Sequence, residues 1–175
     1  LIYGAKETIK AIRSMRFVEL SPDAMRRPSF PGQTVLGDRG ENLSSVLQAV
    51  CEVPGQKETI VEWLRQLTPM DASDFEFTPD QTGRILLTLV EKSGRRTSAY
   101  SASGGTLRFL AMITAMLGPE SPQFYFFEEL ENGIHPARMH LLIQLMEQKA
   151  SEGKIQIVAT THSPRLLRFL SPEAH

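Results

Sequence analysis

The chain contains the run Phe124-Tyr125-Phe126-Phe127-Glu128-Glu129, four consecutive large apolar residues followed by two carboxylates. A short, continuous apolar run is typical of a strand that is buried on both faces, as in a parallel sheet. Ligands of such sheets bind at the carboxyl ends of the strands. We therefore expect this run to be a core strand of an α/β fold, with Glu128 and Glu129 at the ligand-binding edge.

A second apolar run, residues 155–160, ends in the same way on Thr161-His162-Ser163-Pro164. Helical patterns occupy residues 105–117 and 136–150 around the first run. Alternation of strands and helices predicts a parallel sheet that is covered by helices on both faces. His162 would then lie at the same edge as the two glutamates, where an imidazole can donate a hydrogen bond to a phosphate or to an attacking water.

The two carboxylates can hold different roles because successive strand residues point to opposite faces. In a phosphate-hydrolysing site, one carboxylate holds Mg²⁺ through water and the next deprotonates the attacking water. A strand that merely ends in solvated acids, beside a structural histidine, is the plainer interpretation. Taken one at a time, these residues leave both interpretations open.

A glycine-rich turn, Ser103-Gly104-Gly105-Thr106-Leu107-Arg108, opens the apolar helix at residues 105–117. Free backbone N–H groups and the positive end of the helix dipole make such a turn an anion site. The alternative is an ordinary N-cap that binds nothing.

The part of the chain before residue 100 has a different pattern of predicted elements, and we place a domain boundary near that residue. Residues 1–100 are expected to form a helical and hairpin lobe with part of the core, and residues 101–175 the carboxyl-terminal core. Residues 21–40 are rich in proline and glycine and predict a loop. The elements expected are helices at 5–15, 42–53 (capped by Asn42) and 57–67, a strand at 16–20, and antiparallel strands at 74–78, 84–92 and 96–100.

The composition is that of a globular chain. The 175 residues are 41% hydrophobic, and 19 Lys and Arg against 20 Asp and Glu leave a net charge of −1, so the chain as a whole lacks the charge excess of a nucleic-acid-binding protein. The longest apolar run, Phe109–Leu117, is too short to cross a bilayer, so no membrane segment is predicted. Cys51 is the only cysteine, which favours a cytoplasmic location.

Together, these motifs resemble those of ABC-type ATPases of the RecF-like, SMC-like (chromosome-maintenance) and OLD-like groups within the AAA family of P-loop ATPases. The turn at 103–108 resembles the signature motif, residues 124–129 the Walker B strand, residues 131–136 the D-loop, and His162 the switch histidine. The resemblance implies an α/β fold that is part of a P-loop NTPase, namely its carboxyl-terminal portion, with the helical and hairpin lobe before the signature motif.

The resemblance implies roles for the strand ends. Glu128 would be the Mg²⁺ ligand, where the family usually has Asp, and Glu129 would be the general base. His162 would contact the γ-phosphate of ATP. His135 stands where transporters carry Asp, and its His-Pro form is similar to the OLD-like group.

The signature turn would bind ATP from a second subunit. The resemblance assigns cofactor contacts to Ser103, Gly104, Gly105 and Arg108, with Ser103 and Gly105 reaching the γ-phosphate in trans. Hydrolysis would then need a head-to-head homodimer formed through the signature motif and the D-loop, with DNA or an effector protein as a further partner. DNA maintenance, DNA repair or anti-phage defence are the processes that the resemblance implies.

The phosphate-gripping loop Gly-x-x-x-x-Gly-Lys-Ser/Thr (Walker A) does not occur in the chain, and by the resemblance it would lie before Leu1. We expect the chain by itself to bind ATP weakly or not at all. Two alternatives remain. One is a divalent-metal hydrolase or nuclease built from the same carboxylates, for which the ligand spacing is unfavourable. The other is a non-catalytic interaction module.

Overall fold

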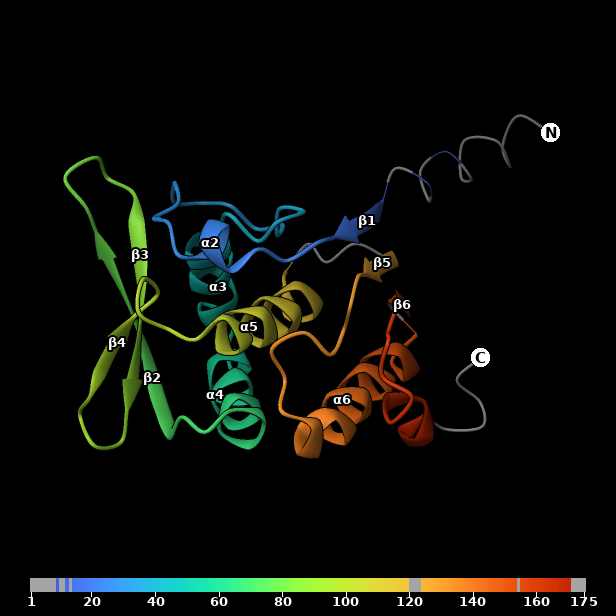
Figure 1. Cartoon of the computed structure of the whole chain (residues 1–175). Helices are drawn as coiled ribbons and strands as arrows, with labels where there is room; N and C mark the ends of the chain where they lie inside the picture. Colours follow the sequence, from blue (N-terminus) through green and yellow to red (C-terminus); the bar gives the residue numbers. More distant parts are fainter. Residues whose placement is uncertain (1–8, 10–11, 13, 120–123, 154, 171–175) are drawn as a thin grey trace.

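The structure is a computed structural model, and it describes residues 9, 12, 14–119, 124–153 and 155–170. It contains a parallel sheet and an antiparallel sheet with helices between them (Figure 1). The parallel sheet has the order β1-β5-β6, formed by β1 (Met15–Val18), β5 (Phe124–Phe127) and β6 (Gln156–Ala159). The antiparallel sheet has the order β2-β3-β4, formed by β2 (Ala72–Pro79), β3 (Ile85–Glu91) and β4 (Arg96–Ser98).

The middle strand of the parallel sheet is β5, and both of its neighbours run in the same direction. Its last residue, Phe127, lies beside Val18 of β1 and Ala159 of β6. The carboxyl ends of the three strands therefore meet at one edge. The predicted α/β class, with a parallel sheet flanked by helices, is confirmed, and so are the antiparallel strands before the signature turn.

The described residues cover one face of the parallel sheet. Tyr125 and Phe127 are buried on the face toward α5 (Gly104–Leu117), and the Tyr125 hydroxyl donates to the carbonyl of Ala115 at 2.6 Å. On the other face, Phe17 and Val158 flank Phe126 in register and are 61% and 40% exposed. The prediction of a helix against the sheet is thus confirmed on the α5 face, whereas helices over the other face stay a prediction.

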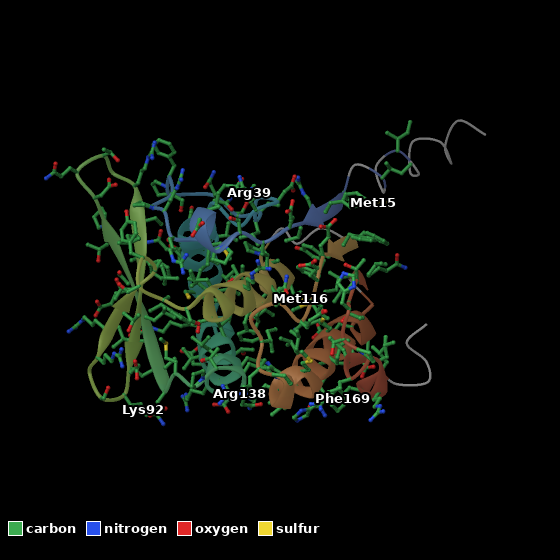
Figure 2. The ribbon with its side chains drawn as sticks, viewed as in Figure 1. Met15, Arg39, Lys92, Met116, Arg138 and Phe169 are labelled. Carbon is green, nitrogen blue, oxygen red and sulfur yellow. The ribbon has the colours of Figure 1, made fainter. Side chains whose placement is uncertain are left out.

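The centre of the molecule is α5, which is buried along almost its whole length from Thr106 to Leu117. Its sequence is apolar on all sides, as a helix surrounded by other elements requires. Helices α3 (Leu43–Cys51) and α4 (Gln56–Leu67) pack between α5 and the antiparallel sheet. Met116, near the end of α5 that points away from the antiparallel sheet, is also buried (Figure 2).

Several predicted boundaries differ from the structure. The loop at 21–40 contains a short helix, α2 (Pro22–Met25), because proline is well suited to the first position of a helix. Asn42 does precede α3, but its amide makes no capping bond. It accepts from the Gly37 N–H at 2.8 Å and donates to the Val35 carbonyl at 2.9 Å, and so it stabilises the preceding loop.

Toward the carboxyl terminus, the helix predicted at 136–150 begins as a short helical turn, Pro136–Arg138, and continues as α6 (Met139–Ser151). The strand predicted at 124–129 ends at Phe127. Most of the helix predicted at 5–15 lies outside the described residues. Within the described ranges, no helix combines the length and the apolar character needed to span a bilayer.

Candidate functional site

The chain turns sharply at Glu129, directly after β5. Glu129 has φ of 47°, in the left-handed region that non-glycine residues rarely adopt. The turn is closed by Asn132, whose backbone N–H donates to the Glu129 carbonyl at 2.9 Å and whose side-chain amide donates to the Glu129 carboxylate. The sequence predicted that strand alternation sets the directions of the Glu128 and Glu129 side chains. Both residues instead belong to this turn, and the turn sets their directions. Backbone strain of this kind often accompanies functional sites.

The turn is joined to the end of β6 through Thr160. The Thr160 hydroxyl accepts from the Glu129 N–H at 3.1 Å, and its carbonyl accepts from the Leu130 N–H at 3.1 Å. His162 therefore lies beside Glu129, with Nε2 4.0 Å from Oε1. The imidazole is 85% exposed and the Glu129 side chain 52% exposed. The structure thus brings together the two residues that the parallel arrangement predicted at one edge.

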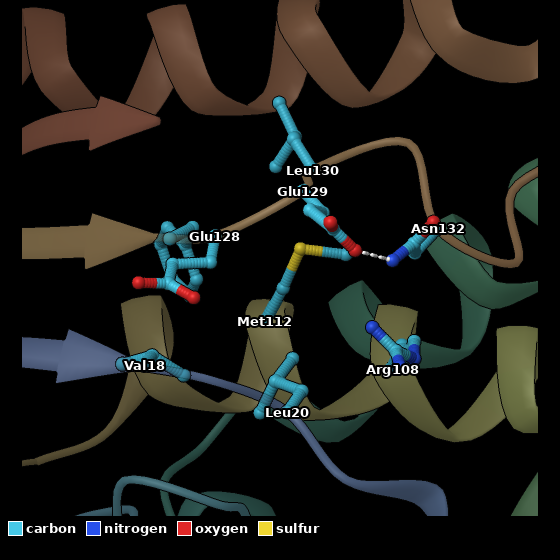
Figure 3. Close-up of a pocket in the computed structure, with 9 residues that line it drawn as sticks. Val18, Leu20, Arg108, Met112, Glu128, Glu129, Leu130 and Asn132 are labelled. Atoms are coloured by element: carbon cyan, nitrogen blue, oxygen red, sulfur yellow. Dashed lines mark hydrogen bonds between the residues drawn. The ribbon is translucent and has the colours of Figure 1, made fainter. Parts of the chain in front are cut away.

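Glu128 lies on the other side of this turn. In Figure 3, Glu128 is beside Val18 at the end of β1, whereas Glu129 is directed toward Asn132. Glu128 is exposed. Among the described residues, no group of three or more His, Cys, Asp or Glu side chains is placed to bind a metal ion. The metal-binding role of Glu128 therefore stays a prediction.

Glu131, the first residue of the D-loop, connects this turn to the segment that carries His162. Its carboxylate accepts from the Thr161 hydroxyl at 2.7 Å and from the His162 backbone N–H at 2.7 Å. Partial burial opposes its ionisation, but these hydrogen bonds outweigh the burial and lower the pKa of Glu131 below its usual value. This contact cannot be predicted from sequence spacing, because Glu131 and Thr161 come close together only when β5 pairs with β6.

The signature turn begins α5 as a regular N-cap. The Ser103 hydroxyl accepts from the Thr106 N–H at 3.0 Å and lies 2.8 Å from the Thr106 hydroxyl. Ser103 is exposed, and Gly104 lies against Pro22 of α2. Gly105 touches the backbone of Gly133 in the D-loop. The N-cap interpretation is thus correct as structure, and the exposed serine leaves a role in trans open.

Among the described residues, the first half of α5 contributes to the lining of two separate pockets. Arg108 lines a pocket with Glu128, Glu129 and Asn132, in which Arg108 and Asn132 lie on the same side (Figure 3). The other pocket lies between the signature turn, the D-loop and the end of α4, at the outer side of the molecule where Figure 2 labels Arg138. Its lining includes Ser103, Gly105, His135 and Arg138. Arg108 therefore lies near the carboxylates of its own chain, whereas Ser103 does not share their pocket.

The chain is similar in fold to SMC head domains. A crystal structure of the Smc head domain with a coiled coil and joint from Pyrococcus yayanosii matches with a TM-score of 0.52 and 14% identity, over 72% of this chain and 24% of that one. The Smc head domain from Pyrococcus furiosus, with an extended coiled coil and bound to the C-terminal domain of ScpA, matches with a TM-score of 0.50 and 14% identity, over 71% of this chain and 30% of that one. The chain thus spans about a quarter to a third of the length of these structures.

No curated protein matches the chain. A protein-family model does, over residues 10–168, and its description reads "AAA domain, putative AbiEii toxin, Type IV TA system". The match includes the signature turn, the strand with the two carboxylates, the D-loop and His162. The chain belongs to this AAA-domain family, and its fold is similar to part of the SMC head domain.

Proposed function

We propose that the chain supplies the hydrolytic half of an ATP-binding site in an ABC-type ATPase that works as a head-to-head dimer. The observation that carries this proposal is the contact between Glu129 and His162 at the carboxyl edge of a parallel sheet, 4.0 Å apart. A carboxylate and an imidazole in this arrangement can orient and deprotonate one water molecule beside a terminal phosphate.

In this proposal, the position of each site residue decides its role. Glu129, held in a tight turn, would take the proton from the attacking water. His162 would donate a hydrogen bond to the γ-phosphate, for which its exposed ring is free to reach outward. Glu128 would hold Mg²⁺ through water on the other side of the turn, and the ion would supply charge neutralisation at the phosphates. Arg108 would face the phosphates of the same site, because it lines the pocket of the two glutamates.

The signature turn would complete the site of a second copy. Ser103 is exposed, lies in a different pocket from Glu129, and begins a 14-residue helix whose positive end attracts anions. We propose that Ser103 and Gly105 contact the γ-phosphate of ATP held by the partner subunit, with Gly104 as a further ATP contact in the same turn. The D-loop, packed on Gly105 through Gly133, would form part of the same dimer interface.

The phosphate-gripping loop would come from a part of the protein outside these residues. The exposure of Phe17 and Val158, on the face away from α5, supports this, since a parallel sheet normally has helices over both faces. We propose that dimerisation on ATP is coupled to DNA maintenance, DNA repair or anti-phage defence, through DNA or an effector protein. We place this activity in the cytoplasm, where a lone reduced cysteine is ordinary.

The test uses the full-length protein that contains this chain. Glu129→Gln keeps the size of the side chain but cannot accept a proton. We expect ATP affinity to persist and turnover to fall by about a thousandfold or more. Equal turnover of the variant and the wild type, or a wild type that does not hydrolyse ATP, would overturn the proposal.

A further inference from the structure

We propose that Glu131 is the positioning residue of the switch histidine: it holds the backbone of His162 so that the imidazole stays at the reacting phosphate. This inference rests on the proposed ATPase function and extends it to a residue that makes no contact with the nucleotide. Its basis is the pair of 2.7 Å hydrogen bonds from Thr161 and His162 to one carboxylate.

The histidine needs such support because its own side chain provides little. With 85% of the imidazole exposed, packing cannot hold the ring in one place. The last backbone pair between the strands involves Thr160, whose N–H donates to the Phe127 carbonyl at 3.0 Å. Beyond Thr160 the chain leaves the sheet, and the next backbone N–H groups need other partners.

Glu131 provides partners for the two residues that follow. One carboxylate oxygen accepts from the His162 N–H, and the other accepts from the Thr161 hydroxyl. The same hydroxyl accepts from the Ser163 N–H at 3.0 Å, so the network extends to the residue after the histidine. Hydrogen bonds to an ionised group are stronger than neutral ones, and two on one carboxylate also fix direction.

Glu131 is well placed to align the two catalytic groups with each other. It follows Glu129 by two residues in the same turn, so the segment that presents the general base also holds the histidine. An error of about 1 Å in the position of a catalytic group costs about a hundredfold in rate. Loss of the Glu131 carboxylate should therefore lower kcat while leaving ATP binding intact.

The experiment measures kcat, ATP dissociation constant and thermal melting for variants of the full-length protein. For Glu131→Ala we expect kcat to fall between about tenfold and a hundredfold, with ATP affinity within about twofold of wild type. Glu131→Gln should restore most of kcat. An amide can accept from the His162 N–H and donate to the Thr161 hydroxyl, whereas it cannot serve as a base.

A second pair of variants tests the same hydrogen-bond network through Thr161, the partner of the Glu131 carboxylate. Thr161→Val removes the hydroxyl with little change in shape and should lower kcat, whereas Thr161→Ser retains the hydroxyl and should not. In the double variant with Glu131→Ala, the effect of Thr161→Val should be largely lost, because the two residues act as a unit.

The outcomes separate this inference from the function on which it rests. A wild-type protein that does not hydrolyse ATP would end both. An active wild type with equal kcat in Glu131→Ala would overturn only the positioning role. So would a Glu131→Gln variant as impaired as Glu131→Ala, since that result would give Glu131 a part in the chemistry.

Discussion

The backbones of Gly105 and Gly133 are in direct contact: a Cβ atom added to Gly105 would lie 1.8 Å from the carbonyl oxygen of Gly133. One added to Gly133 would lie 2.8 Å from the Cα of Gly105. No side chain fits between them without a shift of backbone. The first turn of α5 and the loop after Glu129 are therefore packed as one surface, and this is the surface that we propose for dimerisation.

The first prediction concerns this contact. Gly133 has φ of 78°, so Gly133→Ala meets both backbone strain and the overlap with Gly105. Gly94 is a matched control, since it has φ of 83° but nothing within 4 Å of its added Cβ. Gly94→Ala should cost about 1–2 kcal/mol of unfolding free energy from strain alone. Gly133→Ala should cost about 1–3 kcal/mol more than the control.

Chemical denaturation of the three proteins checks this difference. Gly105→Ala, at a position without positive φ, should show the overlap cost without the strain. Equal losses for Gly133→Ala and Gly94→Ala would mean that the loop and the helix are not in contact in solution.

The second prediction tests whether the signature turn acts on the partner's site. Ser103→Arg and Glu129→Gln should each abolish ATP turnover in the full-length protein. A mixture of the two variants should recover activity. In a mixed dimer, one site combines an intact Glu129 from one subunit with an intact Ser103 from the other.

A mixing control follows from the same geometry. The double variant carrying both changes, mixed with Glu129→Gln, leaves every site without the general base and should stay inactive. Steady-state ATPase rates of the mixtures give the readout. Absence of recovery in the first mixture, with dimers present by light scattering, would argue that Ser103 acts within its own subunit.

The third prediction concerns the attachment of β5 to α5. The buried Tyr125 hydroxyl donates to the Ala115 carbonyl in the last turn of α5. Tyr125→Phe removes this bond and should lower the free energy of unfolding by about 1 kcal/mol. Tyr100→Phe is the control, because Tyr100 is 56% exposed and its change should be close to neutral. Thermal melting that fails to separate the two variants would contradict the prediction.

The fourth prediction concerns the single cysteine. Burial raises the pKa of the Cys51 thiol to about 12, despite the opposing effect of Lys57. The reactive thiolate is therefore scarce at pH 8, and it increases only as the pH approaches that value. Alkylation by iodoacetamide at pH 8 should be slow in the folded protein and fast after denaturation. Rapid labelling of the folded protein, at the rate of a free thiol, would contradict this.

The predictable part of the fold is local in the sequence. Apolar runs located β5 and β6, the all-apolar helix located α5, and period-two patterns with turns located the antiparallel strands. The direction of the strands followed from the intervening helices, since parallel neighbours need a crossover. The exact ends of the strands were harder to predict, because the turn at Glu129 depends on Asn132 and Thr160, which come from different segments.

Other features were missed because they depend on contacts between distant segments. The exposure of Phe17 and Val158 is one such feature, since an apolar residue in a strand pattern does not reveal whether another element covers it. The sequence predicts a loop at Pro22, because a proline that breaks a helix and one that begins it differ only in their surroundings. It predicts a helix cap at Asn42, whose side chain instead bonds to the preceding loop.

The sequence by itself determined the order and type of the elements. It also determined that carboxylates and a histidine follow two parallel strands, because periodicity and chain direction are local properties. Folding alone decided that the Glu131 carboxylate binds the backbone of His162 and that Gly105 meets Gly133. Hydrogen bonds and van der Waals contacts act over a few ångströms in space. Residues separated by some thirty positions reach that distance only after the sheet has paired.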